Sequence, residues 1–381
     1  MKRHIPRRKT WAGAVALAMA AGLALAGCGG GTADNMAGAQ GNDKAASATS
    51  LADIGTIDDL YAAAKAEGAL NVIALPHDWA NWGEVLDAFK AKYPGITVNE
   101  QNPDGSSADE IQAAKTNKGL DTAPDVFDLG LAVALQNTDM FATYKVATWD
   151  DIPADFKNAD GKYWGDYGGY MAVGYDSAKY PEPKSLDDLL GSAYSGAVAI
   201  NGDPTQAGSA FAAVGLATVQ SGGTLDDFTP GIEFFKKLKA AGNFLAVDPT
   251  TATIASGETP VVFDWDYLSA GSVKDVPTWK VVVFSGKGVA GYYQQAINAD
   301  APHPAAARLW EEYLYSDEAQ NLWLKSGARP VRMEAMTAAG TIDATAAAAL
   351  PAAPSEPLIP TEAQNEAAGT LLGEEWAKAV S

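Results

Sequence analysis

The chain has 381 residues, of which 27 are basic and 47 acidic, giving a formal net charge of −20. Single hydrophobic cores stop growing near about 250–300 residues, so this length predicts two domains. An apolar share of 47% argues against a mainly disordered chain, and the acidic balance argues against nucleic-acid binding. One cysteine and three histidines argue against a disulfide framework and a histidine-rich metal centre. We therefore expect no metal and no cofactor.

The N-terminus predicts export. Residues 1–10 carry five basic residues and no acid, and an apolar run follows over residues 11–27, an order typical of a secretory signal. The run ends Leu-Ala-Gly before Cys28, which resembles a bacterial lipobox and implies cleavage before Cys28 and its lipidation. A signal anchor is the alternative, and the pair Arg7-Arg8 leaves twin-arginine export open. Removal of residues 1–27 brings the net charge to −25.

Residues 28–50 are rich in Gly, Ala, Ser and Asn and have almost no large apolar side chains. Such a composition cannot bury a core, so we predict a flexible tether with a reach of roughly 25–30 Å. The predicted mature protein is a body held by its lipid to the extracytoplasmic face of the cell membrane.

The body alternates predicted strands and helices. In the first set, a strand at residues 70–75 precedes an amphipathic helix at 82–93, and strands at 96–98 and 125–129 flank a helix that opens near Ser107. Strand–helix–strand repetition predicts parallel pairing with right-handed crossovers. The fold class is therefore α/β.

A second set of strands and helices begins near residue 197, and strands at 170–176 and 292–298 lie on either side of it. These two strands predict a crossing to a second lobe and a return, which makes a two-lobed fold with a hinge of two strands. The predicted division is lobe I over residues 51–168 and 292–381, and lobe II over residues 169–291.

Catalytic motifs are absent or incomplete. Residues 286–291 match GxGxxG, but no helix follows to face a pyrophosphate, so a glycine-rich hairpin or hinge is the preferred interpretation. No GxxxxGK[ST] or GxSxG motif occurs. Nothing in the sequence requires an enzyme.

Two stretches resemble bacterial extracellular solute-binding proteins of the type II periplasmic kind. Residues 295–310 (QAINADAPHPAAARLW) and 314–327 are similar to the return strand and following helices of the branch handling polyamines, thiamine, ferric iron and aminoethylphosphonate. Residues 69–73 and 89–96 also resemble that branch. The resemblance covers about residues 51–381. It implies a monomeric capture component of an ABC importer that closes on a small ligand and delivers it to a permease with its ATPase.

In open α/β lobes, ligands bind beyond the carboxyl ends of strands, where helix N-termini also offer amides. Four such segments carry polar or aromatic side chains, and the return strand adds a tyrosine pair. Alternatively, the tryptophans pack in a core, and Ser107 and Thr205 only cap helices. The candidate ligand-binding residues are Asp78, Trp79, Trp82, Ser106, Ser107, Thr205, Gln206, Asp264, Trp265, Asp266, Tyr292 and Tyr293.

These candidates include acids and aromatic rings but no Arg or Lys, which favours a polyamine-like or thiamine-like cation over an anion. A phosphonate ligand remains an alternative. Ferric-iron binders often carry adjacent tyrosines, but Tyr292-Tyr293 stands on the return strand, away from that motif's place. An extracytoplasmic enzyme on the same fold and a sensory module are alternatives from other classes.

Overall fold

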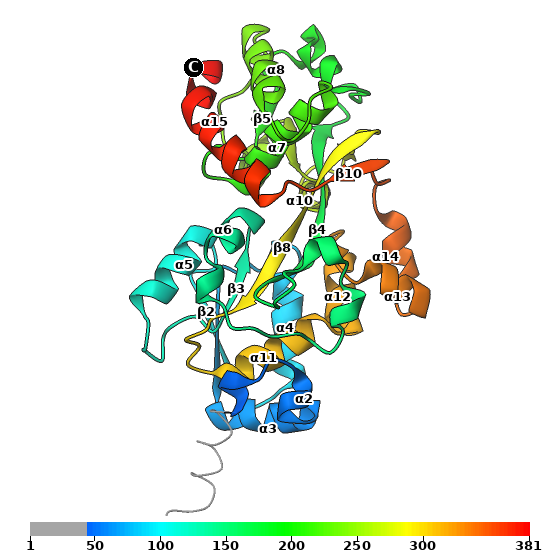
Figure 1. The fold of residues 1–381 in the computed structure, drawn as a ribbon. Coiled ribbons are helices and arrows are strands. Elements are labelled where there is room, and N and C mark those ends of the chain that lie inside the picture. The colour runs from blue at the N-terminus through cyan, green and yellow to red at the C-terminus, as the bar shows by residue number, and fades with distance from the viewer. Residues whose placement is uncertain (1–43) are drawn as a thin grey trace, which may run out of the picture.

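The computed structural model describes residues 44–381, which form two lobes joined by two long strands (Figure 1). β4 (Trp164–Asp176) and β8 (Lys287–Ile297) run antiparallel, side by side, from one lobe into the other. They approach so closely that a Cβ on Gly168 would overlap the carbonyl oxygen of Gly291, which explains the glycines here. The predicted two-lobed α/β fold is confirmed. The predicted signal peptide, Cys28 and most of the predicted tether lie outside the described residues.

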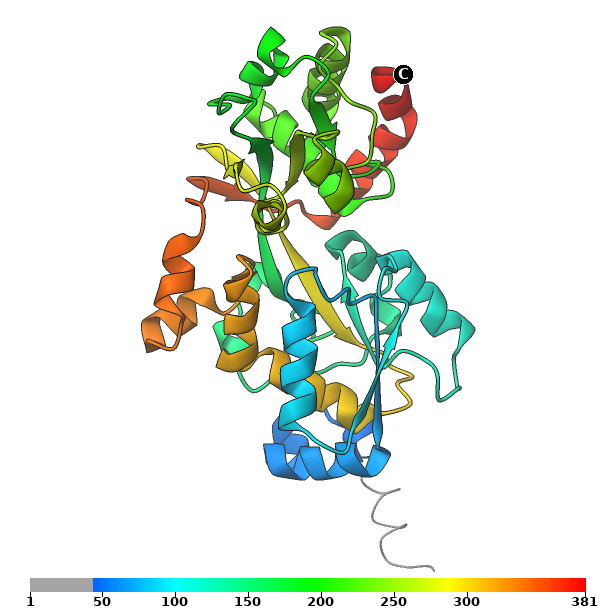
Figure 2. The same ribbon diagram turned by 180° about the vertical axis from the view of Figure 1, so that it is seen from behind.

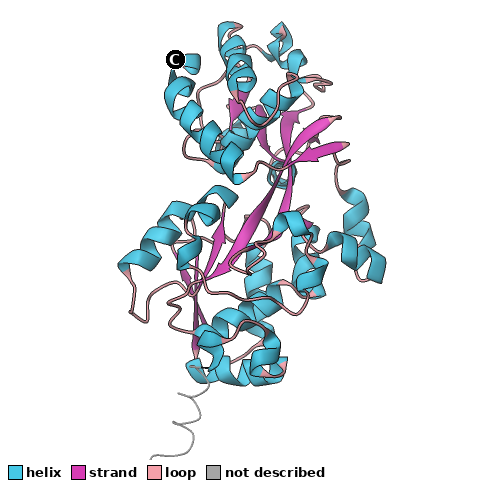
Figure 3. Ribbon diagram, in the orientation of Figure 1, coloured by secondary structure: helices cyan, strands magenta, loops and turns pink. Residues whose placement is uncertain are grey.

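Lobe I comprises residues 44–163 and 298–350, and its helices surround the lower strands (Figures 1 and 3). β1 and β2 form a separate parallel pair, whereas β3 pairs antiparallel with β8. Its core is aromatic, with Trp82, Trp310 and Trp323 fully buried. Its elements are α2 (Leu51–Ile54), α3 (Ile57–Glu67), β1 (Ala69–Ile73), α4 (Trp82–Lys92), β2 (Thr97–Gln101), α5 (Ser107–Thr116), β3 (Val126–Leu129), α6 (Leu131–Gln136), α11 (Pro304–Leu314), α12 (Asp317–Lys325), β9 (Arg329–Pro330), α13 (Met333–Ala339) and α14 (Ala344–Ala349).

Lobe II comprises residues 177–286 and 351–381. Its strands continue the large sheet, in which β6 lies between β4 and β5, and β7 pairs with β4. α7 is buried along most of its length because its side chains are small and apolar. Within residues 44–381, no helix is both long and apolar enough to cross a membrane. The elements are β5 (Val198–Ile200), α7 (Gly208–Gln220), α8 (Thr229–Ala240), α9 (Thr251–Ser256), β6 (Val261–Trp265), α10 (Asp266–Gly271), β7 (Trp279–Val282), β10 (Glu356–Leu358) and α15 (Glu362–Val380).

Residues 44–50, which we assigned to the tether, pack on lobe I instead. Ala45 is fully buried, and the buried guanidinium of Arg308 donates hydrogen bonds to the carbonyl oxygens of Ala46 (3.0 Å) and Ala48 (3.0 and 3.1 Å). These carbonyls supply acceptors that a buried arginine requires. The small side chains within residues 44–50 therefore reflect close packing on lobe I and not a free linker.

The C-terminal residues 351–381 belong to lobe II, whereas the sequence assigned them to lobe I. After α14 the chain returns along the interlobe strands and ends beside α8, as Figure 2 shows from behind. The indole of Trp376 packs edge-on against Phe235 (5.3 Å between ring centroids) and contacts Phe244 (6.3 Å). Burial of this apolar face fixes α15 on lobe II.

The glycine-rich residues 286–291 form no hairpin, so that half of the prediction was wrong, but residues 287–291 lie in β8, one of the two strands that join the lobes, as the hinge alternative expected. Lys287–Gly291 are the first residues of the continuous strand β8. Gly291 is required there because a Cβ would overlap the indole of Trp265.

Candidate ligand-binding cleft

A cavity of about 1170 Å³ lies between the lobes. Lobe I contributes the loop after β1, the start of α5, the end of β3 and α6, and lobe II contributes the β5–α7 loop and Trp265. Residues 289–294 of β8 and residues 357–365 of the C-terminal segment complete the lining. The cavity therefore opens beyond the carboxyl ends of strands, where the fold predicts a ligand.

Aromatic side chains line one side of this cavity. Trp79 follows β1, and its indole nitrogen donates to the Tyr167 hydroxyl (3.0 Å). Tyr293 stacks on Tyr167 (5.5 Å between centroids, 10° between planes) and meets Trp79 edge-on (5.8 Å). Tyr292 packs against Phe156 (4.4 Å). Trp79, Tyr292 and Tyr293 all border the cavity, as the sequence predicted for ligand-binding residues.

Two buried carboxylates on this side were missed from the sequence. Glu110 on α5 accepts a hydrogen bond from the backbone amide of Asp128 (2.9 Å), and both residues line the cavity. Asp128, in β3, also accepts from the Tyr167 hydroxyl (2.9 Å). Burial raises the pKa of both carboxyls. A charged residue rarely occupies an apolar strand. The position of Asp128 in β3 was therefore the sequence signal that could have identified it.

Behind Asp128 lies a second, fully enclosed set of acids. The Gln295 amide donates to Asp128 (3.1 Å) and to Asp166 (2.7 Å), so one side chain bridges two carboxyls. Burial raises the pKa of Asp166, as does the nearby Asp128 charge. Glu311 is fully buried, and no described donor reaches either of its carboxyl oxygens. Burial raises the pKa of Glu311 as well, so the enclosed position favours the protonated forms of these acids.

Gln294 presents an acceptor that lacks a donor. Its Nε2 donates to the carbonyl oxygen of Tyr292 (2.9 Å), whereas its buried Oε1 has no hydrogen-bond partner among the described residues. Because Gln294 lines the cavity, a ligand N–H or O–H is the natural partner for this oxygen.

On the lobe II side, Trp265 lines the cavity with its ring against the Gly291 backbone. Thr205 and Gln206 also line it, in the loop that precedes α7. The amide and hydroxyl of Thr205 both donate to Asp203 (2.8 and 2.7 Å), which holds this loop in a turn. These three predicted residues therefore face the same cavity as Trp79, from the opposite lobe.

Ser106 and Ser107 line the cavity, but both hydroxyls have structural partners. Ser106 is the N-cap of α5 and forms a capping box with Asp109. The Ser107 hydroxyl accepts from the Gly130 amide (3.0 Å) and so joins α5 to the start of α6. The alternative capping interpretation thus holds for Ser106 rather than for Ser107.

Two other predicted residues lie away from the cavity. Asp78 is exposed to solvent. Trp82 is fully buried in lobe I, stacked on Trp310 (6.0 Å) with its indole nitrogen bonded to Tyr167 (3.2 Å). Its place at the start of α4 turns it inward, so the prediction of ligand contact was wrong.

Asp264 and Asp266 also lie outside the lining. Asp264 accepts a hydrogen bond from the Trp265 amide (2.8 Å), and burial raises its pKa to about 6. Asp266 is fully buried, forms an ion pair with Arg329 and accepts from the Tyr170 amide (2.9 Å). Asp266 therefore joins the lobes at the hinge.

Most of the ionisable side chains that line the cavity are acidic. Among the described residues that line the cavity, five are acidic (Asp104, Glu110, Asp128, Asp155 and Glu362) and one, Lys157, is basic. The ammonium of Lys157 donates to the Trp149 carbonyl oxygen (2.7 Å) and lies over the Trp149 ring. No second basic side chain among these lining residues balances the acids, and burial, which raises the pKa of Glu110 and Asp128, reduces the charge of those two.

A model of the bacterial extracellular solute-binding protein family matches residues 122–353. The chain belongs to this family. The family is defined by solute binding and not by catalysis, which agrees with the absence of catalytic motifs. No curated protein matches this solute-binding protein.

Solved structures with this fold include several binding proteins. A spermidine/putrescine ABC transporter substrate-binding protein, PotD from Streptococcus pneumoniae, is 14% identical, with a TM-score of 0.60, over 82% of this chain and 99% of its own. The ferric binding protein from Campylobacter jejuni is 15% identical (TM-score 0.61; 81% and 99%). AfuA from Actinobacillus pleuropneumoniae, bound to fructose-6-phosphate, is 16% identical (TM-score 0.60; 82% and 98%). Identities this low establish the shared fold alone.

No group of three or more His, Cys, Asp or Glu side chains within residues 44–381 is arranged to hold a metal ion. Tyr292 and Tyr293 border the cavity and pack against the aromatic rings of Phe156 and Tyr167, respectively. What the solute-binding protein offers a ligand is therefore a set of carboxyl groups, ring faces and the buried, unpaired amide oxygen of Gln294.

Proposed function

We propose that this solute-binding protein captures an organic cation of the polyamine or thiamine type and delivers it to the permease of an ABC importer. The observation that carries this proposal is the lining of the cavity, with five acids and one engaged lysine. Trp79, Trp265 and Tyr293 offer ring faces, and each cation–π contact contributes roughly 0.5–2 kcal/mol. The buried Oε1 of Gln294 has no partner among the described residues and is available to an N–H of the cation.

A phosphonate is less well supported by the same lining. An anion would rely on backbone amides at the starts of α5 and α7, since the hydroxyls of Ser106 and Thr205 already bond to Asp109 and Asp203. It would also lie near Glu110 and Asp128, which repel an anion whenever they are ionised. We therefore retain the cation as the proposed ligand class.

A thermal-shift screen over polyamines, thiamine, phosphonates, sugars and metal ions tests this proposal on the mature chain, residues 28–381. A ligand at about 100 times its dissociation constant adds about 2.7 kcal/mol of stability. We expect polyamines or thiamine to raise the melting temperature. Stabilisation by phosphonates or sugar phosphates alone would overturn the proposed ligand class.

Replacement of Trp265 by alanine is expected to weaken binding of the stabilising cation about tenfold, or about 1.4 kcal/mol. Trp265 lines the cavity, and its removal takes away a ring face and buried contact area. Trp279→Ala is the matched control, because Trp279 is also a buried tryptophan of lobe II but lies outside the lining. Calorimetry that gives both variants the wild-type affinity would remove Trp265 from the site.

We also propose that the protein is anchored by a lipid on Cys28 at the extracytoplasmic face of the cell membrane. Cys28→Ala is expected to release the protein into the medium, because the lipid would be its sole attachment. Immunoblots of membrane and medium fractions measure this. A variant that stays entirely in the membrane fraction would refute lipid anchoring through Cys28.

A further inference from the structure

The C-terminal segment, residues 356–380, lies beyond the part of the chain that matches the family. β10 pairs in parallel with the start of β8, so that Leu358 lies opposite Val289. α15 follows, with Thr361 as its N-cap and Gln364 closing a capping box. The segment thus passes from the interlobe strands directly into a long helix.

α15 is fixed to lobe II. Leu372 is fully buried, and Trp376 packs against aromatic side chains of that lobe. The side chain of Gln364 adds a hydrogen bond to Asp226 in the α7–α8 loop (2.8 Å). The helix must therefore move with lobe II when the lobes rotate.

The first turn of α15 nevertheless reaches toward lobe I. α15 contacts α6 of lobe I, and the lower end of the red helix points to α6 in Figure 1. Glu362 and Asn365 in this turn line the interlobe cavity, as does Tyr163 of lobe I. The turn is thus the part of lobe II's cavity wall that lies beside α6 of lobe I.

Both side chains of this turn present acceptors to the cavity. Glu362 is solvent-exposed and forms no ion pair among the described residues. The Asn365 amide nitrogen donates to the carbonyl oxygens of Pro360 (3.3 Å) and Thr361 (3.1 Å), which leaves Oδ1 without a described donor. A carboxylate and an amide oxygen side by side suit a ligand with N–H donors and positive charge.

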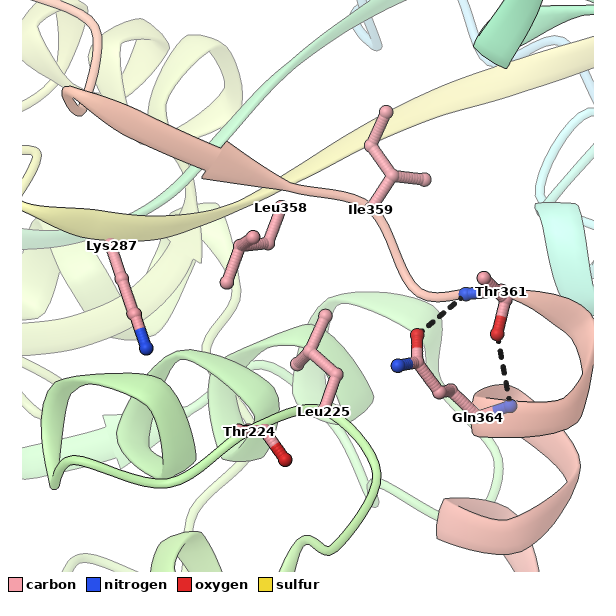
Figure 4. Close-up of a pocket in the computed structure, with 7 residues that line it drawn as sticks. All are labelled: Thr224, Leu225, Lys287, Leu358, Ile359, Thr361 and Gln364. Atoms are coloured by element: carbon pink, nitrogen blue, oxygen red, sulfur yellow. Dashed lines mark hydrogen bonds between the residues drawn. The ribbon is translucent and has the colours of Figure 1, made fainter.

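The residues that precede α15 lie between two cavities. A second pocket of about 320 Å³ lies between this segment and the α7–α8 loop (Figure 4). Leu358, Ile359 and Thr361 line this pocket as well as the ligand cavity. In Figure 4, Leu358 points toward Leu225, whereas Ile359 points to the opposite side. The segment is thus a thin partition between the two cavities.

We propose that the first turn of α15 is part of the ligand site, with Glu362 and Asn365 accepting hydrogen bonds from the nitrogen atoms of a cationic ligand. This inference rests on the proposed function, because an anion would be repelled by Glu362. Closure of the lobes removes water around the carboxylate, which strengthens its attraction to the cation.

Calorimetric titration with spermidine and with thiamine tests this assignment on wild type, Glu362→Gln, Asn365→Ala and Glu366→Gln. Glu366 is the control: it loses the same charge on the same helix but does not line the cavity. We expect about 3- to 10-fold weaker binding for Glu362→Gln and Asn365→Ala, and less than 2-fold for Glu366→Gln. Equal melting temperatures of the ligand-free variants exclude a folding defect.

The outcomes separate this inference from the proposed function. Binding by wild type with equal affinity in all three variants would overturn the role of α15 and leave the proposed function standing. Wild type that binds neither spermidine nor thiamine would overturn both. A selective loss in Glu362→Gln and Asn365→Ala supports both.

Discussion

Replacement of Arg329 by alanine is expected to lower the free energy of unfolding by about 3–5 kcal/mol. Arg329 forms a buried ion pair with Asp266, whose side chain is fully shielded from solvent. It also donates to the Pro351 carbonyl oxygen (2.7 Å) and lies over the Tyr170 ring (4.5 Å). Its loss leaves a buried carboxylate and a carbonyl group without their partner at the hinge.

Lys325→Ala is the control for this prediction. Lys325 pairs with Glu84, but the two side chains are 61% and 48% exposed. Exposed pairs contribute about 0–1 kcal/mol. Equilibrium unfolding in urea measures both losses, and similar values for the two variants would show that the hinge ion pair has no special role.

The stability of the ligand-free protein is expected to fall as pH rises from about 5.5 to 8. Burial raises the pKa of Glu110, Asp128, Asp166 and Glu311, and it raises the pKa of Glu67 to about 7. The folded state therefore holds protons that the unfolded chain has released. The stability that these groups contribute is complete below their unfolded pKa values and is lost as pH rises through the folded ones. Each such proton changes stability by about 1.4 kcal/mol per pH unit.

Carboxylates with lowered pKa values do not reverse this trend. Asp53 and Asp109 are held below their ordinary pKa by hydrogen bonds, so they are ionised in both states throughout this window. Glu311→Gln is expected to reduce the slope, because it removes a buried proton-binding group that has no described hydrogen bond. Glu334→Gln, at an exposed position, should leave the slope unchanged. Urea unfolding at several pH values that shows stability constant or rising would contradict the account.

The sequence predicted the fold, and eight of its twelve candidate residues line the cavity, because strand ends are local features. Trp79 lies in the loop after β1 and Trp265 ends β6, and both line the cavity. Asp264 lies outside the lining because it precedes Trp265 in β6, and neighbours along a strand point to opposite sides. Asp266 begins α10 and pairs with Arg329, and no local pattern reveals a partner so distant along the chain.

Glu110 and Asp128, which were not proposed from the sequence as site residues, were missed for a different reason. Glu110 lies on the buried side of an amphipathic helix, and its neighbour Asp128 comes from a strand 18 residues later. Only the tertiary contact places them together beside the cavity. The C-terminal helix was misplaced for a similar reason: the apolar side chains around Trp376 fit either lobe until packing against Phe235 is known.

Titration calorimetry of the mature chain with spermidine, thiamine and fructose 6-phosphate, at pH 6 and pH 8, tests the central claim most directly. Ionised Glu110 and Asp128 attract a cation, and their raised pKa values leave them more protonated at pH 6. The account predicts binding of at least one of the two cations, tighter at pH 8 than at pH 6, with release of protons into the buffer. Tight binding of fructose 6-phosphate, without binding of either cation at either pH, would contradict it.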